Sequence, residues 1–304
     1  MSASQRSRAW TQAAGCRIRS RALDAPFGAE LAIDAGADLR ADEGEVLRAL
    51  FAEHGLLVVR GREISREEQI AWVSALGRLE PDASGQPMEM EVTNQHDRST
   101  APPGELIFHY DYAYDPQPIP AISMYGLLVD GEVTPTRFAN SSRVLQALPA
   151  HTLAALEGRE AAHACFLYSP ERPEERTPEP EVLIARGEPG WGPLHYWAHH
   201  PLLWSNAAGT PTLFACVQHT DRIVGVPRAE SDALLAEIYA HLYADEAVYE
   251  HRWLPGDLVI WDNLSVQHAR PEPNDRPRTL RRFHVSDTDL TLQYLEVGRK
   301  HGYV

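Results

Sequence analysis

From about residue 105 onward the chain is a succession of short apolar runs, rich in β-branched and aromatic side chains and separated by Gly, Pro and Asp. The runs are LIFHYDY (106–112), AISMYGLLV (121–129), TPTRFAN (134–140), TPTLFACV (210–217), DLVIWDN (257–263) and RTLRRFHV (278–285). Runs of this length with this punctuation are typical of strands in an antiparallel sandwich or barrel. The chain is therefore predicted to be mainly β.

Helical patterns precede and interrupt these strands. The predicted helices cover 44–55, 64–80, 141–158 and 230–247, and a strand at 56–61 separates the first two. Ser65 with Glu68 three residues later is the signature of a capping box at the start of the second helix. The opening helix–strand–helix is expected to pack as a cover on the remainder, which gives a mainly β fold with flanking helices (α+β).

The charge balance narrows the class of partner. The 304 residues include 28 Lys and Arg against 43 Asp and Glu, for a formal net charge of −15. Such an excess of acid repels phosphate backbones and anionic lipid, and no apolar run approaches the roughly 18 residues that a membrane span needs. We therefore expect a small-molecule partner, with neither nucleic acid nor membrane, and the sequence leaves a homo-oligomer open.

Boundaries follow from composition. One domain is expected over 25–290, between a flexible N-terminal tail (1–24) and a C-terminal tail (291–304). The segment 169–181 is rich in Pro and Glu and is predicted to be a solvated loop or lid. The three cysteines are too widely spaced for a disulfide framework or a zinc site, and the N-terminus lacks the apolar stretch of a secretory signal. These features favour a cytoplasmic protein.

A His-x-Asp triplet lies in the first of the strand-like runs. Residues i and i+2 of a strand project from the same face, so His109 and Asp111 are expected to point together. Imidazole and carboxylate together form a ligand set that suits Fe(II). An ordinary His–Asp hydrogen bond at a strand edge is the alternative, and a second triplet, His219-Thr220-Asp221, shows how weak a lone match is.

A second group of residues lies near the C-terminus. The apolar strand 258–261 is followed by His268 and, ten residues later, by the alternating strand that begins at Arg278. Period two places Arg278, Leu280 and Arg282 on one face of that strand. Two guanidinium groups facing inward would be costly without anions to pair with. A solvated basic edge strand is the alternative.

Taken together, these pieces resemble the iron(II)- and 2-oxoglutarate-dependent dioxygenases of the taurine dioxygenase and phenoxyacetate dioxygenase group (TauD/TfdA). The family pattern is His-x-Asp, a long stretch, a distal His, and an Arg about ten residues later. The connecting landmarks are also present: Pro118-Ile119-Pro120, Thr136, Phe138-Ala139-Asn140 and the segment 255–263. The resemblance covers roughly residues 25–285. His219-Thr220-Asp221 does not match it, because it lies only 49 residues before His268 and no such landmarks follow.

The resemblance implies a double-stranded β-helix, or jelly roll, and a set of site residues. His109, Asp111 and His268 would bind Fe(II). Arg278 would grip the distal carboxylate of the co-substrate 2-oxoglutarate, with a hydroxyl contact from Thr136. Thr134 is an alternative, because the run before Phe138 is longer than in the family pattern and contains a proline.

The implied reaction couples the oxidative decarboxylation of 2-oxoglutarate by O2 to the oxidation of a substrate C–H bond. In halogenating relatives a small residue replaces the carboxylate of the first motif. Asp111 keeps it here, so hydroxylation, or a related desaturation or oxidative cleavage, is expected. The position of Arg282 implies a small anionic or amino-acid-like substrate, and Tyr110 and Asn94 are predicted to contact it.

Two other readings use the same residues. A cupin-like zinc hydrolase would bind its metal through His109, Asp111 and His268 and attack with a bound water. Arg278 argues against it, because hydrolysis needs no buried anion clamp. A non-catalytic jelly-roll binding module is the other reading, and the presence of all three ligand positions argues against it.

Overall fold

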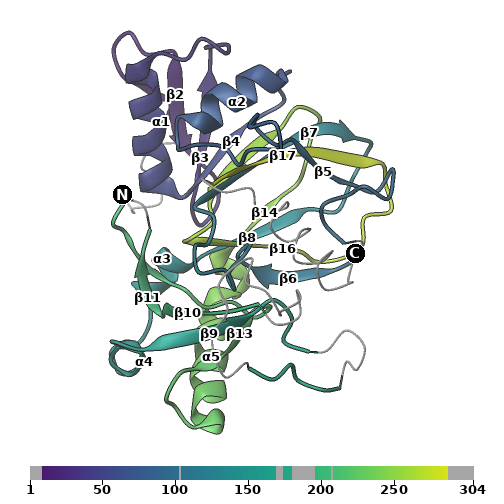
Figure 1. Ribbon diagram of the computed structural model, residues 1–304. Coiled ribbons are helices and arrows are strands. Elements are labelled where there is room, and N and C mark those ends of the chain that lie inside the picture. Colours follow the sequence, from purple (N-terminus) through teal and green to yellow (C-terminus); the bar gives the residue numbers. More distant parts are fainter. Residues whose placement is uncertain (1–8, 103, 169–173, 180–195, 207, 287–304) are drawn as a thin grey trace.

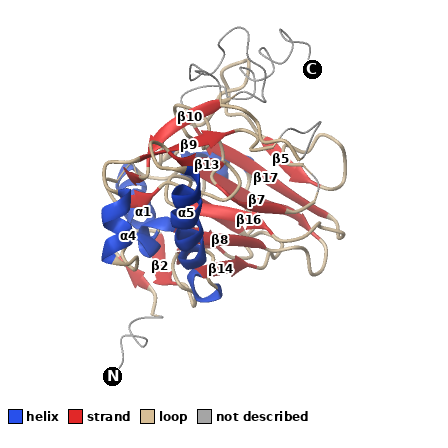
Figure 2. Ribbon diagram, turned by 90° about the horizontal axis from the view of Figure 1, so that it is seen from below, coloured by secondary structure: helices blue, strands red, loops and turns tan. Residues whose placement is uncertain are grey.

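A computed structural model of the protein describes residues 9–102, 104–168, 174–179, 196–206 and 208–286. Within these residues two facing β-sheets form a double-stranded β-helix, the predicted jelly roll, with helices at both ends (Figure 1). In Figure 2, β17 and β7 of the larger sheet run in nearly the same direction as β16 and β8 of the smaller sheet. This near alignment is usual for two sheets that pack face to face.

The larger sheet has eight strands in the order β1-β2-β3-β4-β15-β7-β17-β5. Its strands are β1 (Thr11–Gln12), β2 (Ile18–Ala22), β3 (Ala29–Ile33), β4 (Leu56–Val59), β5 (Met90–Thr93), β7 (Ala121–Val129), β15 (Leu258–Asp262) and β17 (Arg278–Val285). All neighbours pair antiparallel except β3 and β4. β4 therefore lies inside this sheet, between β3 and β15, rather than in a separate cover as predicted.

The smaller sheet has the order β14-β8-β16-β6. Its strands are β6 (Leu106–His109), β8 (Thr136–Asn140), β14 (Val248–His251) and β16 (Val266–Arg270). Apolar side chains from both sheets meet between them, including Val58 from the larger sheet and Phe138 from the smaller. The rings of Phe138 and Trp261 pack edge to face across this core, with centroids 5.4 Å apart. Burial of such aromatic side chains stabilises the contact between the sheets.

Two helices, α1 (Ala41–His54) and α2 (Arg66–Ser74), pack on the outer face of the larger sheet. Leu47 of α1 and Trp72 of α2 are fully buried there against β4 and β15. The predicted capping box is confirmed, because Ser65 and Glu68 each accept a hydrogen bond from the other's backbone N–H.

A third layer covers the opposite end of the molecule. It contains α3 (Ser141–Leu145), α4 (Ala150–Leu156), α5 (Arg228–Leu242), the short 3-10 helix η3 (Asp245–Ala247), β9 (Glu160–Ala164), β10 (Trp197–Pro201), β11 (Leu203–Ser205), β12 (Pro211–Leu213) and β13 (Thr220–Ile223). The single helix predicted over 141–158 is two helices, because Pro149 lies between them and cannot donate a helical hydrogen bond. None of the helices in the described part of the chain combines the length and apolar composition needed to cross a bilayer.

The prediction of a flexible N-terminal tail is wrong for residues 11–22. This segment contains β1 and β2, which extend the larger sheet beyond β3. Buried Ile18 and the ion pair between Arg17 and buried Glu43 of α1 fix this edge. The predicted C-terminal tail lies outside the described residues, as does most of 169–181. Among the described residues of that loop, Arg176 forms an ion pair with Asp221, and the carboxylate of Glu179 contacts the imidazole of His199.

The turn before β15 yields a stability prediction. Gly256 has φ +79°, and a Cβ there would lie 2.8 Å from the carbonyl oxygen of Arg62, which is backbone and cannot give way. Gly225 has a similar φ of +72° but open space around it. Gly225→Ala is expected to lower the free energy of unfolding by about 1–2 kcal/mol through backbone strain alone. Gly256→Ala is expected to cost clearly more, and equal losses in urea denaturation would contradict the clash.

Candidate functional site

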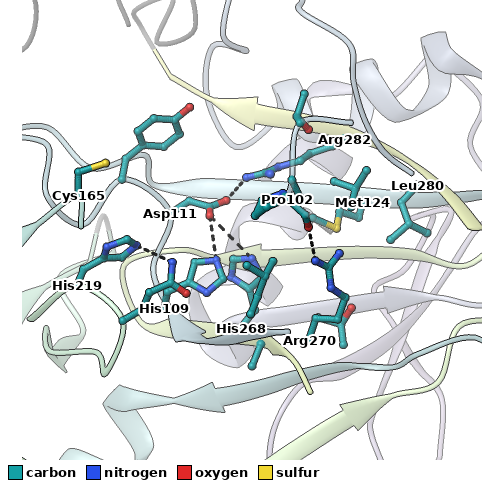
Figure 3. A pocket seen from close by; sticks show the side chains of 18 of the residues that line it. Pro102, His109, Asp111, Met124, Cys165, His219, His268, Arg270, Leu280 and Arg282 are labelled. Atoms are coloured by element: carbon teal, nitrogen blue, oxygen red, sulfur yellow. Dashed lines mark hydrogen bonds and ion pairs between the residues drawn. The ribbon is translucent and has the colours of Figure 1, made fainter. Parts of the chain in front are cut away.

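The two motif histidines meet across a pair of neighbouring strands. His109 ends β6, and His268 lies directly opposite it in β16. Their ring centroids are 4.2 Å apart. Asp111 follows β6 and turns toward both rings, with its Oδ1 3.3 Å from Nε2 of His109 and 3.9 Å from Nε2 of His268 (Figure 3). One ligand atom from each of the three residues lies within 4.8 Å of the others.

Burial favours the neutral form of both imidazoles, which is the form that binds metals. Nδ1 of His109 donates to the carbonyl oxygen of Ile107 at 2.7 Å, which leaves the lone pair of Nε2 facing Asp111. Burial lowers the pKa of His109 to about 4 and the pKa of His268 well below its usual range. Two neutral imidazoles and one carboxylate fit Fe(II), and this is the one such group of three in the described part of the chain.

Asn263 fixes the backbone that carries the carboxylate. Its Oδ1 accepts from the N–H of Asp111 at 3.0 Å, and its Nδ2 donates to the carbonyl oxygen of Asp111 at 3.0 Å. Tyr112, the next residue, has φ 58° and is the one described non-glycine residue with positive φ. Such backbone is unfavourable for a tyrosine and is tolerated where the surroundings impose it. The sequence pattern included Asn263 only as the last residue of the segment 255–263 and did not predict its hydrogen bonds to Asp111.

The triad opens onto a cavity of about 300 Å³. That volume is at the lower end of the ~300–1,000 Å³ typical of small-molecule sites. The charged and aromatic residues of its lining include Tyr112, Tyr114, Phe166, His219, Arg270, Arg278 and Arg282, in addition to the triad. The cavity therefore combines a metal-type donor set, several cations and an aromatic wall.

Arg278 and Arg282 point inward, as period two predicts, and Arg282 has an acidic partner. Its Nη2 donates to Oδ2 of Asp111, the oxygen on the far side from the histidines (Figure 3). Its Nε is buried without a hydrogen-bond partner among the described residues. Burial lowers the pKa of Arg282 to about 10. The side chain predicted to face a substrate anion therefore also orients the carboxylate of the triad.

Arg278 has no carboxylate partner among the described residues. Its Nη1 donates to the carbonyl oxygen of Thr134 at 2.8 Å, and burial lowers its pKa to about 10, with a further contribution from the charge of Arg270. Arg270 itself donates to two backbone carbonyls, those of Pro102 and Gly104. Two desolvated guanidinium groups without acids indicate that this end of the cavity receives an anion.

The two candidate threonines lie in different places. Thr136 is buried and lines the cavity. The hydroxyl of Thr134 instead donates to the carbonyl oxygen of Pro273 at 3.0 Å, and its N–H donates to the side chain of Asn274. Of the two, the geometry brings Thr136 to the cavity.

Tyr110 and Asn94, which were predicted to contact substrate, are not among the described residues that line the cavity. Tyr110 follows the last residue of β6 and is fully buried, and its hydroxyl donates to the carbonyl oxygen of Leu213. Asn94 binds backbone instead, and its Oδ1 accepts from the N–H of Arg278 at 3.0 Å. Substrate contact by these two residues stays a prediction that the lining of this cavity does not support.

The second triplet does not form a metal site. His219 lines the cavity, with its ring centroid 6.1 Å from that of His109, and burial lowers its pKa to about 3. Asp221 turns away from it and pairs with three arginines. They are Arg176, Arg222 and Arg228. Its carboxylate is therefore not available to a metal beside His219.

Arg270 is a cavity residue that sequence reasoning missed, although a signal was present. It lies two residues after His268 on the same strand, so the same period-two rule places both on one face. The aromatic residues Tyr114 and Phe166 had no comparable signal, because they come from loops whose position depends on packing.

Comparisons with known proteins agree with this geometry. The family model described as "Taurine catabolism dioxygenase TauD, TfdA family" matches residues 19–284. A 2,4-dichlorophenoxyacetate dioxygenase of Cupriavidus pinatubonensis, described as alpha-ketoglutarate-dependent, is 28% identical over 84% of this chain and 92% of its own length. A (S)-phenoxypropionate/alpha-ketoglutarate-dioxygenase of Sphingobium herbicidovorans is 30% identical over 81% and 86%. The crystal structure of AAD-2 in complex with Mn(II) and N-oxalylglycine superposes with a TM-score of 0.69 at 21% identity, covering 90% of this chain and 99% of that one.

The triad yields a metal-binding prediction. Asp111→Ala removes one of three donors and is expected to weaken Co(II) binding by at least the roughly 10–100-fold that loss of an outer-shell partner costs. His219→Ala is the matched control, because it empties part of the same cavity without removing a donor, and it should change the affinity only a few-fold. Calorimetric titration of the metal-free protein measures both. A larger loss from His219→Ala than from Asp111→Ala would reverse the assignment.

Proposed function

The chain belongs to the TauD, TfdA family of dioxygenases, and we propose that it couples oxidative decarboxylation of 2-oxoglutarate to C–H oxidation of a small anionic substrate, with Fe(II) held by His109, Asp111 and His268. One observation carries the proposal. A metal-type triad and a buried arginine without an acidic partner open onto the same cavity.

The triad residues have the roles of metal ligands. When bound, Fe(II) supplies the redox chemistry by which O2 oxidises 2-oxoglutarate to succinate and carbon dioxide and oxidises the substrate C–H bond. The hydrogen bond from His109 to Ile107 keeps Nε2 of His109 available as a donor. Asn263 and Arg282 hold Asp111 from opposite sides, through its backbone and through Oδ2, so that Oδ1 faces the two histidines.

Arg278 is proposed to bind the distal carboxylate of 2-oxoglutarate. A planar guanidinium can form two parallel hydrogen bonds to a carboxylate, and such charge-assisted pairs are strong in a desolvated site. Only its Nη1 donates to a described residue, the carbonyl of Thr134, so donors remain for the ligand. Thr136, which lines the same cavity, is proposed to add a hydroxyl contact.

The substrate is proposed to combine an anionic group with an apolar or flat part. The unpartnered Nε of Arg282 supports the first feature, and the aromatic side chains of Tyr112 and Phe166 in the cavity wall support the second. The names of the two relatives specify substrates of this kind, 2,4-dichlorophenoxyacetate and (S)-phenoxypropionate. The oxidation is proposed to be a hydroxylation, or a related desaturation or oxidative cleavage.

The acidic net charge supports a small molecule as the partner rather than nucleic acid or a membrane surface. All three cysteines are free, which supports our proposal of a cytoplasmic protein.

The test is incubation of the purified protein with Fe(II), ascorbate and 2-oxoglutarate against a panel of aryl and alkyl carboxylates, following succinate. We expect succinate release that depends on Fe(II) and rises with one class of acid. No succinate release with any panel member, together with hydrolysis of the corresponding methyl esters supported by Zn(II) alone, would contradict the proposal and favour a hydrolase built on the same triad.

The two inward arginines yield a further prediction. Arg278→Ala removes a desolvated charge pair, which typically costs about 2–5 kcal/mol, or about 30- to several-thousand-fold in affinity for 2-oxoglutarate. Arg282→Lys keeps a cation beside Asp111 and should leave 2-oxoglutarate binding within a few-fold while weakening the substrate. Anaerobic titration of the Fe(II)–2-oxoglutarate charge-transfer absorption measures the affinity of each variant for 2-oxoglutarate. Loss of that absorption in Arg282→Lys but not in Arg278→Ala would exchange the two roles.

A further inference from the structure

A buried tryptophan donates a hydrogen bond to the cavity threonine. Nε1 of Trp253 lies 3.0 Å from Oγ1 of Thr136. Thr136 opens β8, and Trp253 follows β14, the strand that pairs with β8 so that His251 lies opposite Thr136. Trp253 is 3% exposed and Thr136 is 7% exposed, so little water competes for this hydrogen bond.

The chemistry of the two groups fixes the direction of the bond. An indole N–H can only donate, so the oxygen of Thr136 is the acceptor. The hydroxyl hydrogen of Thr136 must then point to another acceptor, and none is found among the described residues. Because Thr136 lines the cavity together with Arg278, an anion bound in the cavity can supply the acceptor for that hydrogen.

We propose that Trp253 is a positioning residue for the co-substrate. Its N–H holds the hydroxyl of Thr136 as a donor aimed at the carboxylate beside Arg278. The inference rests on the proposed function, because that carboxylate is the distal group of 2-oxoglutarate. A hydroxyl that is already oriented loses no rotational freedom when the anion binds, so the contact is stronger than that of a free rotor.

Trp253 is itself held in place. Its ring packs edge-on against His251, with centroids 4.5 Å apart and an interplanar angle of 79°. His251 is fully buried, with Nδ1 2.9 Å from the hydroxyl of Tyr249 and Nε2 3.3 Å from the carboxylate of Asp257. Asp257 in turn accepts from Nη1 of Arg60 at 2.7 Å. The indole is therefore held by a chain of buried neighbours that do not line the cavity, as a positioning group requires.

The test separates a role at the distal carboxylate from general packing. The Zn(II)-loaded protein, which cannot turn over, is titrated calorimetrically with N-oxalylglycine, a dicarboxylate analogue of 2-oxoglutarate. Oxalate serves as a second probe, because it can chelate the metal but has no distal carboxylate. Trp253→Phe is expected to weaken N-oxalylglycine roughly 2- to 10-fold, the worth of a neutral hydrogen bond, and to leave oxalate unchanged.

Trp197→Phe is the matched control. Trp197 is as deeply buried, but its indole N–H has no partner among the described residues, so removing it should change neither titration. Unchanged N-oxalylglycine affinity in a folded Trp253→Phe protein would overturn the inference. An equal loss for oxalate would also overturn it, because the effect would then lie at the metal.

A double-mutant cycle tests whether Trp253 acts through Thr136. Thr136→Val removes a hydroxyl bonded to a charged group and is expected to weaken N-oxalylglycine about 10-fold or more. In that background Trp253→Phe should add less than about 2-fold, because the hydroxyl it orients is gone. If the two losses multiply, Trp253 does not act through Thr136 and the inference falls.

A spectroscopic measurement covers the case in which Trp253→Phe does not fold. In protein labelled with 15N-tryptophan, the indole resonance that Thr136→Val moves most identifies Trp253. That resonance should shift when N-oxalylglycine binds and stay in place with oxalate; a resonance that ignores both would overturn the inference. If the wild-type protein binds oxalate but not N-oxalylglycine, the proposed function fails, and this inference falls with it for a separate reason.

Discussion

The pairing register between β6 and β16 is the constraint on which the site depends. It places His268 opposite His109, and a slip of one residue would turn one of the two imidazoles to the other face of the sheet. The register is held because β16 also pairs with β8 on its other side, where Phe138 packs into the core between the sheets. The hydrophobic core therefore fixes the relative position of two ligands that lie far apart in the sequence.

The cavity contains more positive than negative charge. Three arginines line it, and Asp111 is the one carboxylate among the described residues of its lining. Burial disfavours the charged form of a guanidinium, so desolvation lowers the pKa of both Arg278 and Arg282, and Arg278 has no carboxylate partner among the described residues. The ligands proposed for this site, a dicarboxylate co-substrate and an anionic substrate, would supply the missing negative charge. The excess of cations in the cavity therefore favours the binding of anions, whereas it does not favour folding of the protein without them.

The support around the site divides into two halves. Asn263 and Arg282 orient Asp111 at the metal end. Trp253, backed by His251, orients Thr136 at the anion end. Each of these supporting groups lies on a strand or within two residues of the end of one. This arrangement gives both ends of the cavity their geometry before any ligand arrives.

Local periodicity let the sequence alone predict several features. The inward arginines of β17 and the capping box at Ser65 depend only on spacing within one element. The same spacing rule predicted that Asp111 lies beside His109, although β6 ends at His109 and Asp111 lies in the turn that follows. The tertiary structure decided which elements meet. It placed Arg282 against Asp111 and Trp253 against Thr136, engaged the side chains of Tyr110 and Asn94 in hydrogen bonds to backbone groups, and added β1 and β2 to the larger sheet. No spacing rule covers these contacts, because each joins segments whose approach is set by the packing of the whole core.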